Sequence, residues 1–143
     1  MELAAMTKVL GGKKVLRKNL QSRMDLVDLS NQGVTKDALL HLAKYFSFSV
    51  NQMTQLLPVT ERTIQRYTPD EPLSRMVSEQ ILQIAEVAAK GAKVFEGRDG
   101  FLTWMNHPNK ALNNKTPMSL LNSKFGKDMV LDELGRIEHG VFS

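Results

Sequence analysis

The sequence contains no cysteine. Disulfide frameworks and thiolate–zinc sites are therefore excluded, and an intracellular location is favoured, because disulfides are characteristic of secreted proteins. No apolar run approaches the roughly 18 residues that a transmembrane helix requires, and the first residues lack the apolar core of a signal peptide. These absences predict a cytoplasmic protein without membrane association.

Motifs of catalysis and of metal binding are also missing. The histidines His41, His107 and His139 are scattered, without the helical spacing or the carboxylate partner of a zinc site. The sequence has neither a Gly-x-Ser-x-Gly motif nor a phosphate-binding loop. We therefore expect no enzyme activity, no catalytic residue, no metal site and no cofactor.

The composition is that of a folded protein with an uneven basic charge. With 143 residues, 42% of them hydrophobic, the chain is long enough for one domain or for two small ones that share a core. The net charge is +4. The excess lies in residues 1–33, which contain Lys8, Lys13, Lys14, Arg17, Lys18 and Arg23 against Glu2, Asp25 and Asp28. Nucleic acid is a possible partner, but the simpler interpretation is a solvated, partly mobile basic arm.

Apolar residues recur at helical spacing along most of the chain, and no alternating segment of useful length is present. The predicted fold class is therefore all-α. After a frayed start, Gly11-Gly12 should precede a helix over 13–29. A long helix over 74–95 is expected to join the two halves of the molecule. The inner face of the helix over 13–29 would consist of Leu16, Leu20, Met24 and Val27.

Residues 49–66 have the pattern of a helix-turn-helix. Ser49 and Gln52 fit a capping box, Pro58 should stop that helix, and Thr60 can cap the next one. Polar side chains on the second helix suit DNA, because arginine can bond guanine, glutamine can bond adenine, and threonine can hold a phosphate. The predicted DNA contacts are Thr60, Arg62, Thr63, Gln65 and Arg66. The alternative is an ordinary helix pair with a solvated face.

Residues 104–140 place helix starts, helix stops and glycines unusually close together. Thr116-Pro117 is a strong start signal, and a last helix is expected over 124–139, closed by Gly140. Gly135 inside that helix would cost about 1 kcal/mol relative to alanine. We expect a close approach of another backbone, from the same chain or from a partner, to offset this cost. Trp104, the only tryptophan, is expected in the core.

Two segments resemble one known family. MTQLLPVTERTIQR is similar to the Xre-type helix-turn-helix, although Pro58 stands where glycine is usual. Trp104, Pro108-Asn109, Ala111-Leu112, Lys115-Thr116-Pro117, Leu120-Leu121, Gly126, Val130-Leu131, Leu134-Gly135-Arg136-Ile137 and His139-Gly140 follow one another in order. This pattern resembles the C-terminal toxin-binding domain of Xre/MbcA/ParS antitoxins, with Asn113-Asn114 in place of a glycine-containing turn. The resemblance covers roughly residues 34–143.

The resemblance implies an antitoxin of a type II toxin–antitoxin system, whose usual partner is a RES-domain toxin that degrades NAD⁺. It divides the chain into a basic arm and first helix (1–33), an Xre-like helix-turn-helix for the operon's promoter DNA (34–73), a connecting helix (74–98) and a toxin-binding domain (99–143). We expect that domain to cover the toxin's active site through Arg136, Glu138, His139, Gly140, Val141, Phe142 and Ser143.

A homodimer is also expected, because two recognition helices that read half-sites give useful specificity. Two other interpretations remain. The chain could be a stand-alone helix-turn-helix regulator without a toxin partner, or a small helical scaffold that binds neither toxin nor DNA.

Overall fold

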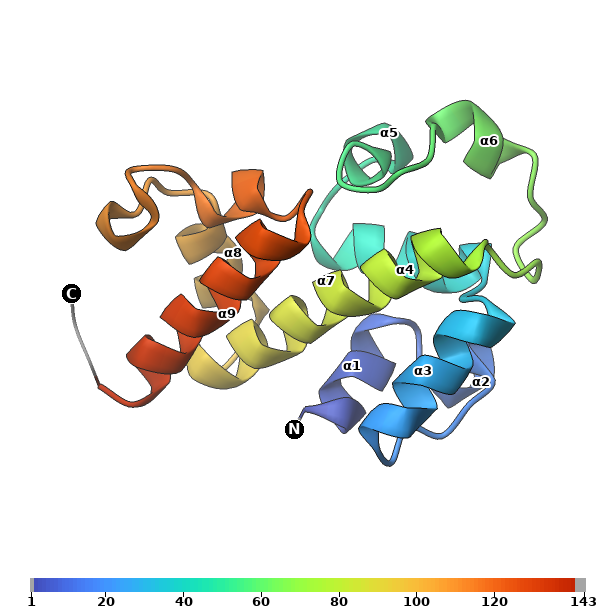
Figure 1. Ribbon diagram of the computed structural model, residues 1–143, viewed down its shortest axis with the longest axis horizontal. Helices are drawn as coiled ribbons and strands as arrows, with labels where there is room; N and C mark the ends of the chain where they lie inside the picture. Colours follow the sequence, from blue (N-terminus) through green and yellow to red (C-terminus); the bar gives the residue numbers. More distant parts are fainter. Residues whose placement is uncertain (1, 141–143) are drawn as a thin grey trace.

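The computed structural model describes residues 2–140, and these residues form nine α-helices and two short 3₁₀ helices (Figure 1). The helices are α1 (Leu3–Val9), α2 (Lys13–Leu16), α3 (Arg23–Gln32), α4 (Lys36–Tyr45), α5 (Val50–Thr54), α6 (Glu61–Gln65), α7 (Arg75–Val94), α8 (Arg98–Met105), η1 (Lys110–Leu112), η2 (Pro117–Leu120) and α9 (Lys124–Glu138). Between residues 2 and 140, extended pairing is limited to isolated bridges at Thr35–Pro72 and Asn109–Lys115. The predicted all-α fold is confirmed.

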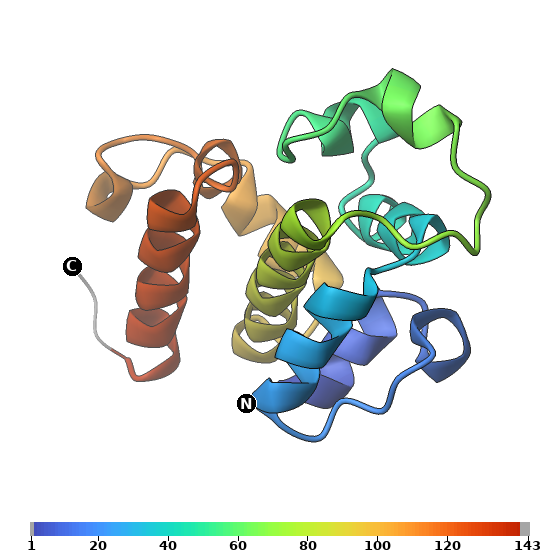
Figure 2. The ribbon, with the colours of Figure 1, turned by 45° about the vertical axis from the view of Figure 1, so that its right-hand side comes forward.

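Helix α7 is the centre of the molecule, as the long apolar pattern predicts. Its 20 residues begin after Ser74, whose hydroxyl accepts a hydrogen bond from the Val77 amide at 3.3 Å. Helices α1 and α3 pack on one side of α7, and α8 and α9 pack on the other (Figures 1 and 2). No helix within residues 2–140 combines the length and hydropathy that a membrane crossing needs.

The N-terminal segment is a packed helix, so the prediction of a frayed, mobile arm is wrong. Leu3, Met6 and Val9 of α1 are buried, and the helix packs against α7. Gly11 and Gly12 then turn the chain with φ angles of +103° and +94°, which are accessible mainly to glycine. The apolar residues of α1 span barely two helical turns. A pattern this short does not identify a helix from the sequence alone.

The predicted single helix over 13–29 is also wrong, because the chain forms α2 and α3 instead. Arg17 ends α2 in a left-handed conformation at φ +59°. A new capping box starts α3, in which Asp25 Oδ2 accepts hydrogen bonds from the Gln21 and Ser22 amides at 2.8 and 3.1 Å. This restart changes which face of the helix is buried. Met24 and Val27, predicted to face inward, are 65% and 52% exposed.

The two halves of the molecule share one core, and Arg98 joins them at the surface. Phe46 after α4 and Phe101 of α8 have ring centroids 6.1 Å apart within this core. Arg98 at the start of α8 donates from Nε to the Tyr45 carbonyl at 2.6 Å and from Nη2 to the Ser47 hydroxyl at 2.5 Å. The start of α8 is therefore tied to the end of α4.

Candidate functional site

Helices α5 and α6 form a compact helix-turn-helix whose starts follow the predicted caps. The Ser49 hydroxyl accepts from the Gln52 amide at 3.2 Å, and the Gln52 side chain accepts from the Ser49 amide at 2.9 Å. Thr60 Oγ1 accepts from the Thr63 amide at 3.1 Å. Met53 and Ile64 are fully buried, which fixes both helices on the core. The predicted helix-turn-helix is confirmed as a structural unit.

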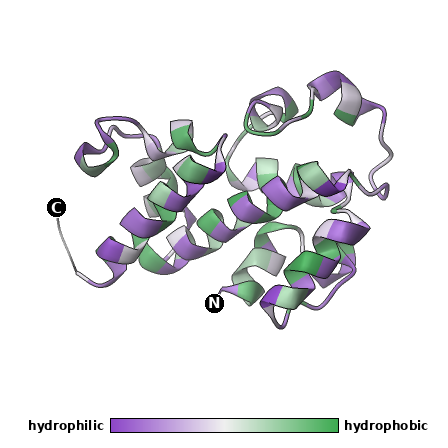
Figure 3. Cartoon of the chain, viewed as in Figure 1, coloured by the Kyte–Doolittle hydropathy of each residue, from purple (hydrophilic) through white to green (hydrophobic). Residues whose placement is uncertain are grey.

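The side chains predicted to contact DNA lie mainly on the outer surface of α6. Arg62, Gln65 and Arg66 are exposed, and within residues 2–140 they make no hydrogen bond or ion pair through their side chains. Thr60 is exposed, whereas Thr63 is half-buried and receives a hydrogen bond from the Thr60 hydroxyl at 3.0 Å. Figure 3 shows α6 as mainly hydrophilic. The arrangement leaves two guanidinium groups and an amide available to an outside ligand.

The loop after α6 is bonded to the start of α4, a feature that the sequence analysis missed. Lys36 Nζ donates to the Tyr67 carbonyl at 2.9 Å, and the Leu73 amide donates to the Val34 carbonyl at 2.8 Å. Gly33 makes this contact possible, because an added Cβ would lie 2.4 Å from the Leu73 carbonyl oxygen. These bonds fix the position of α6 relative to the core.

Part of the basic charge lies beside this loop. Lys14 and Arg17 border a shallow depression together with Asp70, and Asp37 lines it as well. Lys18 is not part of this basic surface, because its ammonium group lies 3.8 Å from carboxylate oxygens of both Asp25 and Asp28. The basic N-terminal residues are thus divided between internal ion pairs and a surface next to the helix-turn-helix.

In the C-terminal half, a tight loop over 109–115 precedes η2. The Asn109 amide donates to the Lys115 carbonyl at 3.0 Å, and the Asn109 side chain accepts from the Ala111 amide at 2.8 Å. Asn113 and Asn114 both adopt left-handed conformations, with φ of +59° and +64°. Asparagine tolerates this region better than other non-glycine residues. The asparagine pair therefore makes this turn without a glycine.

The close backbone approach expected in α9 occurs at Gly126 and not at Gly135. An added Cβ at Gly126 would lie 1.9 Å from the Leu120 carbonyl oxygen of η2. At Gly135, an added Cβ would meet nothing within 4 Å in the part of the chain that the structure describes, residues 2–140. Of the two alternatives expected at Gly135, the approach of a backbone from the same chain is therefore wrong, and the approach of a partner stays a prediction.

The residues predicted to contact the toxin have different environments. Glu138 Oε1 lies 2.5 Å from Lys90 Nζ, and its Oε2 lies 3.2 Å from Lys93 Nζ. These lysines hold the pKa of the Glu138 carboxyl below its usual range, despite an opposing effect of burial. Glu138 thus anchors the end of α9 to α7, which leaves it less available to a partner than we expected.

The remaining predicted contacts lie at the exposed end of α9. Arg136 is exposed and pairs with Glu133 at 3.3 Å. The His139 side chain is 77% exposed, and Gly140 ends the helix at φ +72°. The others, Val141, Phe142 and Ser143, lie outside the described residues.

Among residues 2–140, five large hydrophobic side chains are exposed, and sequence reasoning did not single out this set. They are Met24, Val27, Met76, Phe125 and Met129. Phe125 and Met129 lie on α9, one helical turn apart, Met24 and Val27 lie on α3, and Met76 lies at the start of α7. By contrast, Trp104 packs as expected against Phe95, with ring centroids 5.7 Å apart.

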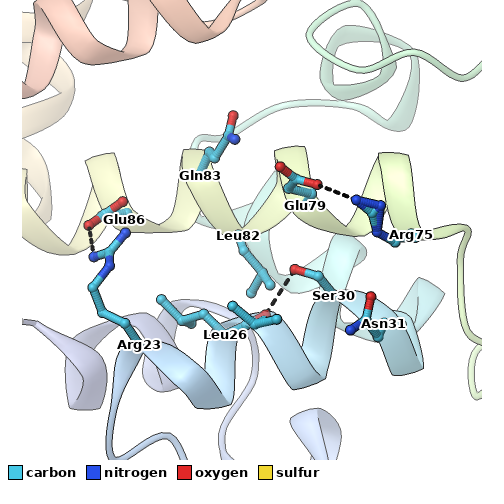
Figure 4. Close-up of a pocket in the computed structure, with 10 residues that line it drawn as sticks. Arg23, Leu26, Ser30, Asn31, Arg75, Glu79, Leu82, Gln83 and Glu86 are labelled. Atoms are coloured by element: carbon cyan, nitrogen blue, oxygen red, sulfur yellow. Dashed lines mark hydrogen bonds and ion pairs between the residues drawn. The ribbon is translucent and has the colours of Figure 1, made fainter.

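A groove between α3 and α7 lies next to Val27 (Figure 4). Arg23 and Glu86 pair at one end, with 3.0 Å between Nη1 and Oε2. Arg75 and Glu79 lie 4.0 Å apart at the other end. The groove therefore combines an apolar border with charges of both signs.

Comparison with known proteins identifies both halves. Residues 25–86 match the antitoxin Xre-like helix-turn-helix domain, and residues 90–140 match the antitoxin Xre/MbcA/ParS C-terminal toxin-binding domain. A protein of Yersinia enterocolitica named Antitoxin Xre is 32% identical over 120 residues, which cover 82% of this chain and 81% of that relative. The chain belongs to the Xre antitoxin family. It is therefore an antitoxin of a toxin–antitoxin system and carries a helix-turn-helix.

A second Antitoxin Xre agrees with this assignment, and a solved structure has a similar fold. An Antitoxin Xre of Photorhabdus laumondii is 26% identical over 121 residues, covering 79% of this chain and 78% of that protein. The fold is similar to a chain in the crystal structure of the M. tuberculosis MbcT–MbcA toxin–antitoxin complex, with a TM-score of 0.58 at 19% identity. That match covers 76% of this chain and 96% of the other. The antitoxin family assignment disfavours the scaffold interpretation.

Proposed function

We propose that this antitoxin neutralises a RES-domain toxin encoded next to it and represses their common promoter. The C-terminal region over 99–143 would cover the entrance of the toxin's active site and so prevent NAD⁺ degradation. Residues 34–73 would bind the promoter, residues 74–98 would connect the two functions, and the protein would act in the cytoplasm without catalysing a reaction itself. The observation that carries this proposal is the presence of two separate surfaces, α6 and α9, on opposite halves of one core.

Promoter binding is assigned to α6 because its exposed cations have no partner among the described residues. Arg66 and Gln65 have the donors needed to read guanine and adenine edges in the major groove, and Arg62 suits a phosphate or base contact. The short α6 is capped and fixed by buried Ile64, so its outer side chains can enter a groove as a unit.

The variant Arg66→Ala tests promoter binding. If Arg66 reads a base, its loss should weaken binding to the promoter by about 1–3 kcal/mol in a gel-shift titration. Lys110→Ala is the control, because Lys110 is an exposed cation on η1, outside both the helix-turn-helix and the groove between α3 and α7. Equal affinity of wild type and Arg66→Ala would remove Arg66 from the interface.

A homodimer is proposed because paired recognition helices can read two half-sites. The groove between α3 and α7 supports it, since an isologous contact joins the same surface of both copies, and charges of both signs on that surface can pair across it. Exposed Met24 and Val27 on α3 would supply the apolar contact. The double variant Met24→Asp/Val27→Asp should sediment as a monomer. A wild type that sediments as a monomer at the concentrations used for DNA binding would contradict the proposal.

Toxin neutralisation can be tested by co-expression with the neighbouring RES-domain protein. A tagged antitoxin should retain the toxin during purification, and cells that hold both proteins should keep their NAD⁺. Removing residues 140–143 tests the contribution of the tail, for which we expect release of the toxin. Cells that tolerate the toxin after this truncation would show that the tail is not required.

A further inference from the structure

In the first turn of α9, an aromatic residue is exposed to solvent and a lysine is buried. The Phe125 side chain is 83% exposed, whereas Lys127, two residues later, is 2% exposed. A sequence that only had to fold would place the aromatic ring in the core and the ammonium group in water. Local rules of this kind are broken most often at functional sites, where another requirement outweighs stability.

Several contacts hold α9 in the rotation that exposes Phe125. The Ser123 hydroxyl accepts from the Gly126 amide at 3.0 Å, and Gly126 lies directly against the Leu120 carbonyl. Lys127 Nζ donates to the Leu121 carbonyl at 3.3 Å, although burial lowers the pKa of this ammonium group. Turning the helix to bury Phe125 would break each of these contacts.

The other end of α9 is fixed as well, by the pairing of Glu138 with Lys90 and Lys93 of α7. Exposed residues between these two fixed ends recur at intervals of four and three, which places them along one face of the helix. This face, which we call the α9 stripe, consists of Phe125, Met129, Asp132, Arg136 and His139. It presents two large apolar side chains at one end and mostly polar ones at the other.

We propose that the α9 stripe is the docking face for the toxin, with Phe125 as the apolar anchor and Met129 beside it. This inference rests on the proposed function. A rigid aromatic side chain on a prefixed helix loses little conformational entropy on binding, and such residues dominate the energetics of many interfaces. Lys124 and Asp128, which pair at 2.8 Å next to Phe125, form part of a polar rim.

The toxin is favoured over a second copy of this chain as the occupant. The α9 stripe lies entirely within residues 90–140, the part that matches the family's toxin-binding domain. A Cβ added at Gly135 would meet no other side chain or distant backbone within 4 Å among residues 2–140, so this position, which borders the stripe, leaves room for a close approach of the toxin backbone. The apolar Met24 and Val27 and the groove assigned to self-association lie on α3 and α7, away from α9.

The test compares toxin affinity among single alanine variants of the full-length antitoxin, with the purified neighbouring RES-domain protein as the probe. Phe125→Ala should bind the toxin about 30-fold or more weakly, as expected for an interface hot spot, and Met129→Ala should show a smaller loss. Met76→Ala is the matched control, because Met76 is a 65% exposed apolar residue on α7. Its toxin affinity should equal that of wild type.

The outcomes separate this inference from the proposed function. If wild type does not bind the toxin, the proposed function fails. If wild type binds and Phe125→Ala binds equally well, the docking assignment alone is overturned. Sedimentation of the antitoxin without toxin completes the test. If Phe125→Ala sediments with a lower molecular mass than wild type, the stripe serves self-association and the proposal is overturned. Phe125→Ala should keep the fold, because the side chain that it removes is exposed. Thermal unfolding of the variant checks this.

Discussion

At the residue scale, the two glycines of α9 have different structural roles. Gly126 is required, because its lack of a side chain lets α9 start directly against the Leu120 carbonyl of η2. Gly135 is not required by this chain, and it leaves an unfilled position on the helix surface. The residue type alone indicates a close approach at both positions. Only the tertiary structure shows that Gly126 has such a close approach within the molecule.

Alanine at these two positions should have opposite effects on stability. Gly126→Ala forces the new Cβ against backbone and should lower the free energy of unfolding by about 1–3 kcal/mol, the usual cost of overpacking. Gly135→Ala should raise it by up to about 1 kcal/mol, because alanine is the better helix former and has room there. Urea denaturation of the isolated antitoxin measures both changes. Equal stability of Gly126→Ala and wild type would contradict the packing described for η2 and α9.

Glu138 should make the stability of α9 depend on pH. Lys90 and Lys93 lower its pKa, so the unfolded carboxyl takes up a proton at higher pH than the folded one. Its stabilising contribution is therefore fully present above the ordinary glutamate pKa of about 4.3 and is lost as the pH falls through the lower, folded-state value. Wild type should be more stable than Glu138→Gln at pH 7, and the difference should disappear in acid.

Thermal unfolding of both proteins between pH 7 and pH 3 measures this effect. The matched control is Glu79→Gln, since Glu79 lies 4.0 Å from Arg75 on the exposed face of α7. That control should differ little from wild type over the whole range. A difference between wild type and Glu138→Gln that persists unchanged at pH 3 would show that the ion pairs are not its cause.

At the element scale, the sequence predicts helices well where a cap and a long apolar pattern coincide. Ser49, Thr60 and Ser74 each begin a helix where expected, because one side-chain oxygen satisfies a free amide locally. The prediction fails between residues 13 and 32. There, a left-handed Arg17 and the Ser22–Asp25 capping box break a pattern that looks continuous in its apolar spacing.

Arg98 should couple the helix-turn-helix half to the α8–α9 half. Arg98→Ala removes its bonds to the Tyr45 carbonyl and the Ser47 hydroxyl, which should lower the free energy of unfolding by about 1–3 kcal/mol. Arg98→Lys should recover only part of the loss, because an ammonium group cannot reproduce the planar geometry that reaches both acceptors. Fluorescence of Trp104 on α8 and circular dichroism of all helices can follow denaturation together. Stability of Arg98→Ala equal to that of wild type would contradict the coupling.

At the scale of the whole molecule, the two functional surfaces differ in how far the sequence reveals them. The α6 surface follows from local caps and residue types, so its side chains could be named in advance. The α9 stripe could not, because Phe125 and Met129 look like ordinary core residues in an apolar pattern. Their exposure depends on the contacts of Gly126 and Lys127 with η2, which are tertiary. Conversely, the sequence suggests that Glu138 is free to contact a partner, whereas the structure pairs it with Lys90 of α7.

We propose that this antitoxin silences an NAD⁺-degrading toxin by covering its active site. The most direct measurement is the rate of NAD⁺ hydrolysis by the purified neighbouring RES-domain protein, titrated with the full-length antitoxin. We expect the rate to fall to background at a fixed molar ratio, and Phe125→Ala to shift the titration to much higher antitoxin concentrations. An undiminished rate at saturating wild-type antitoxin would contradict it.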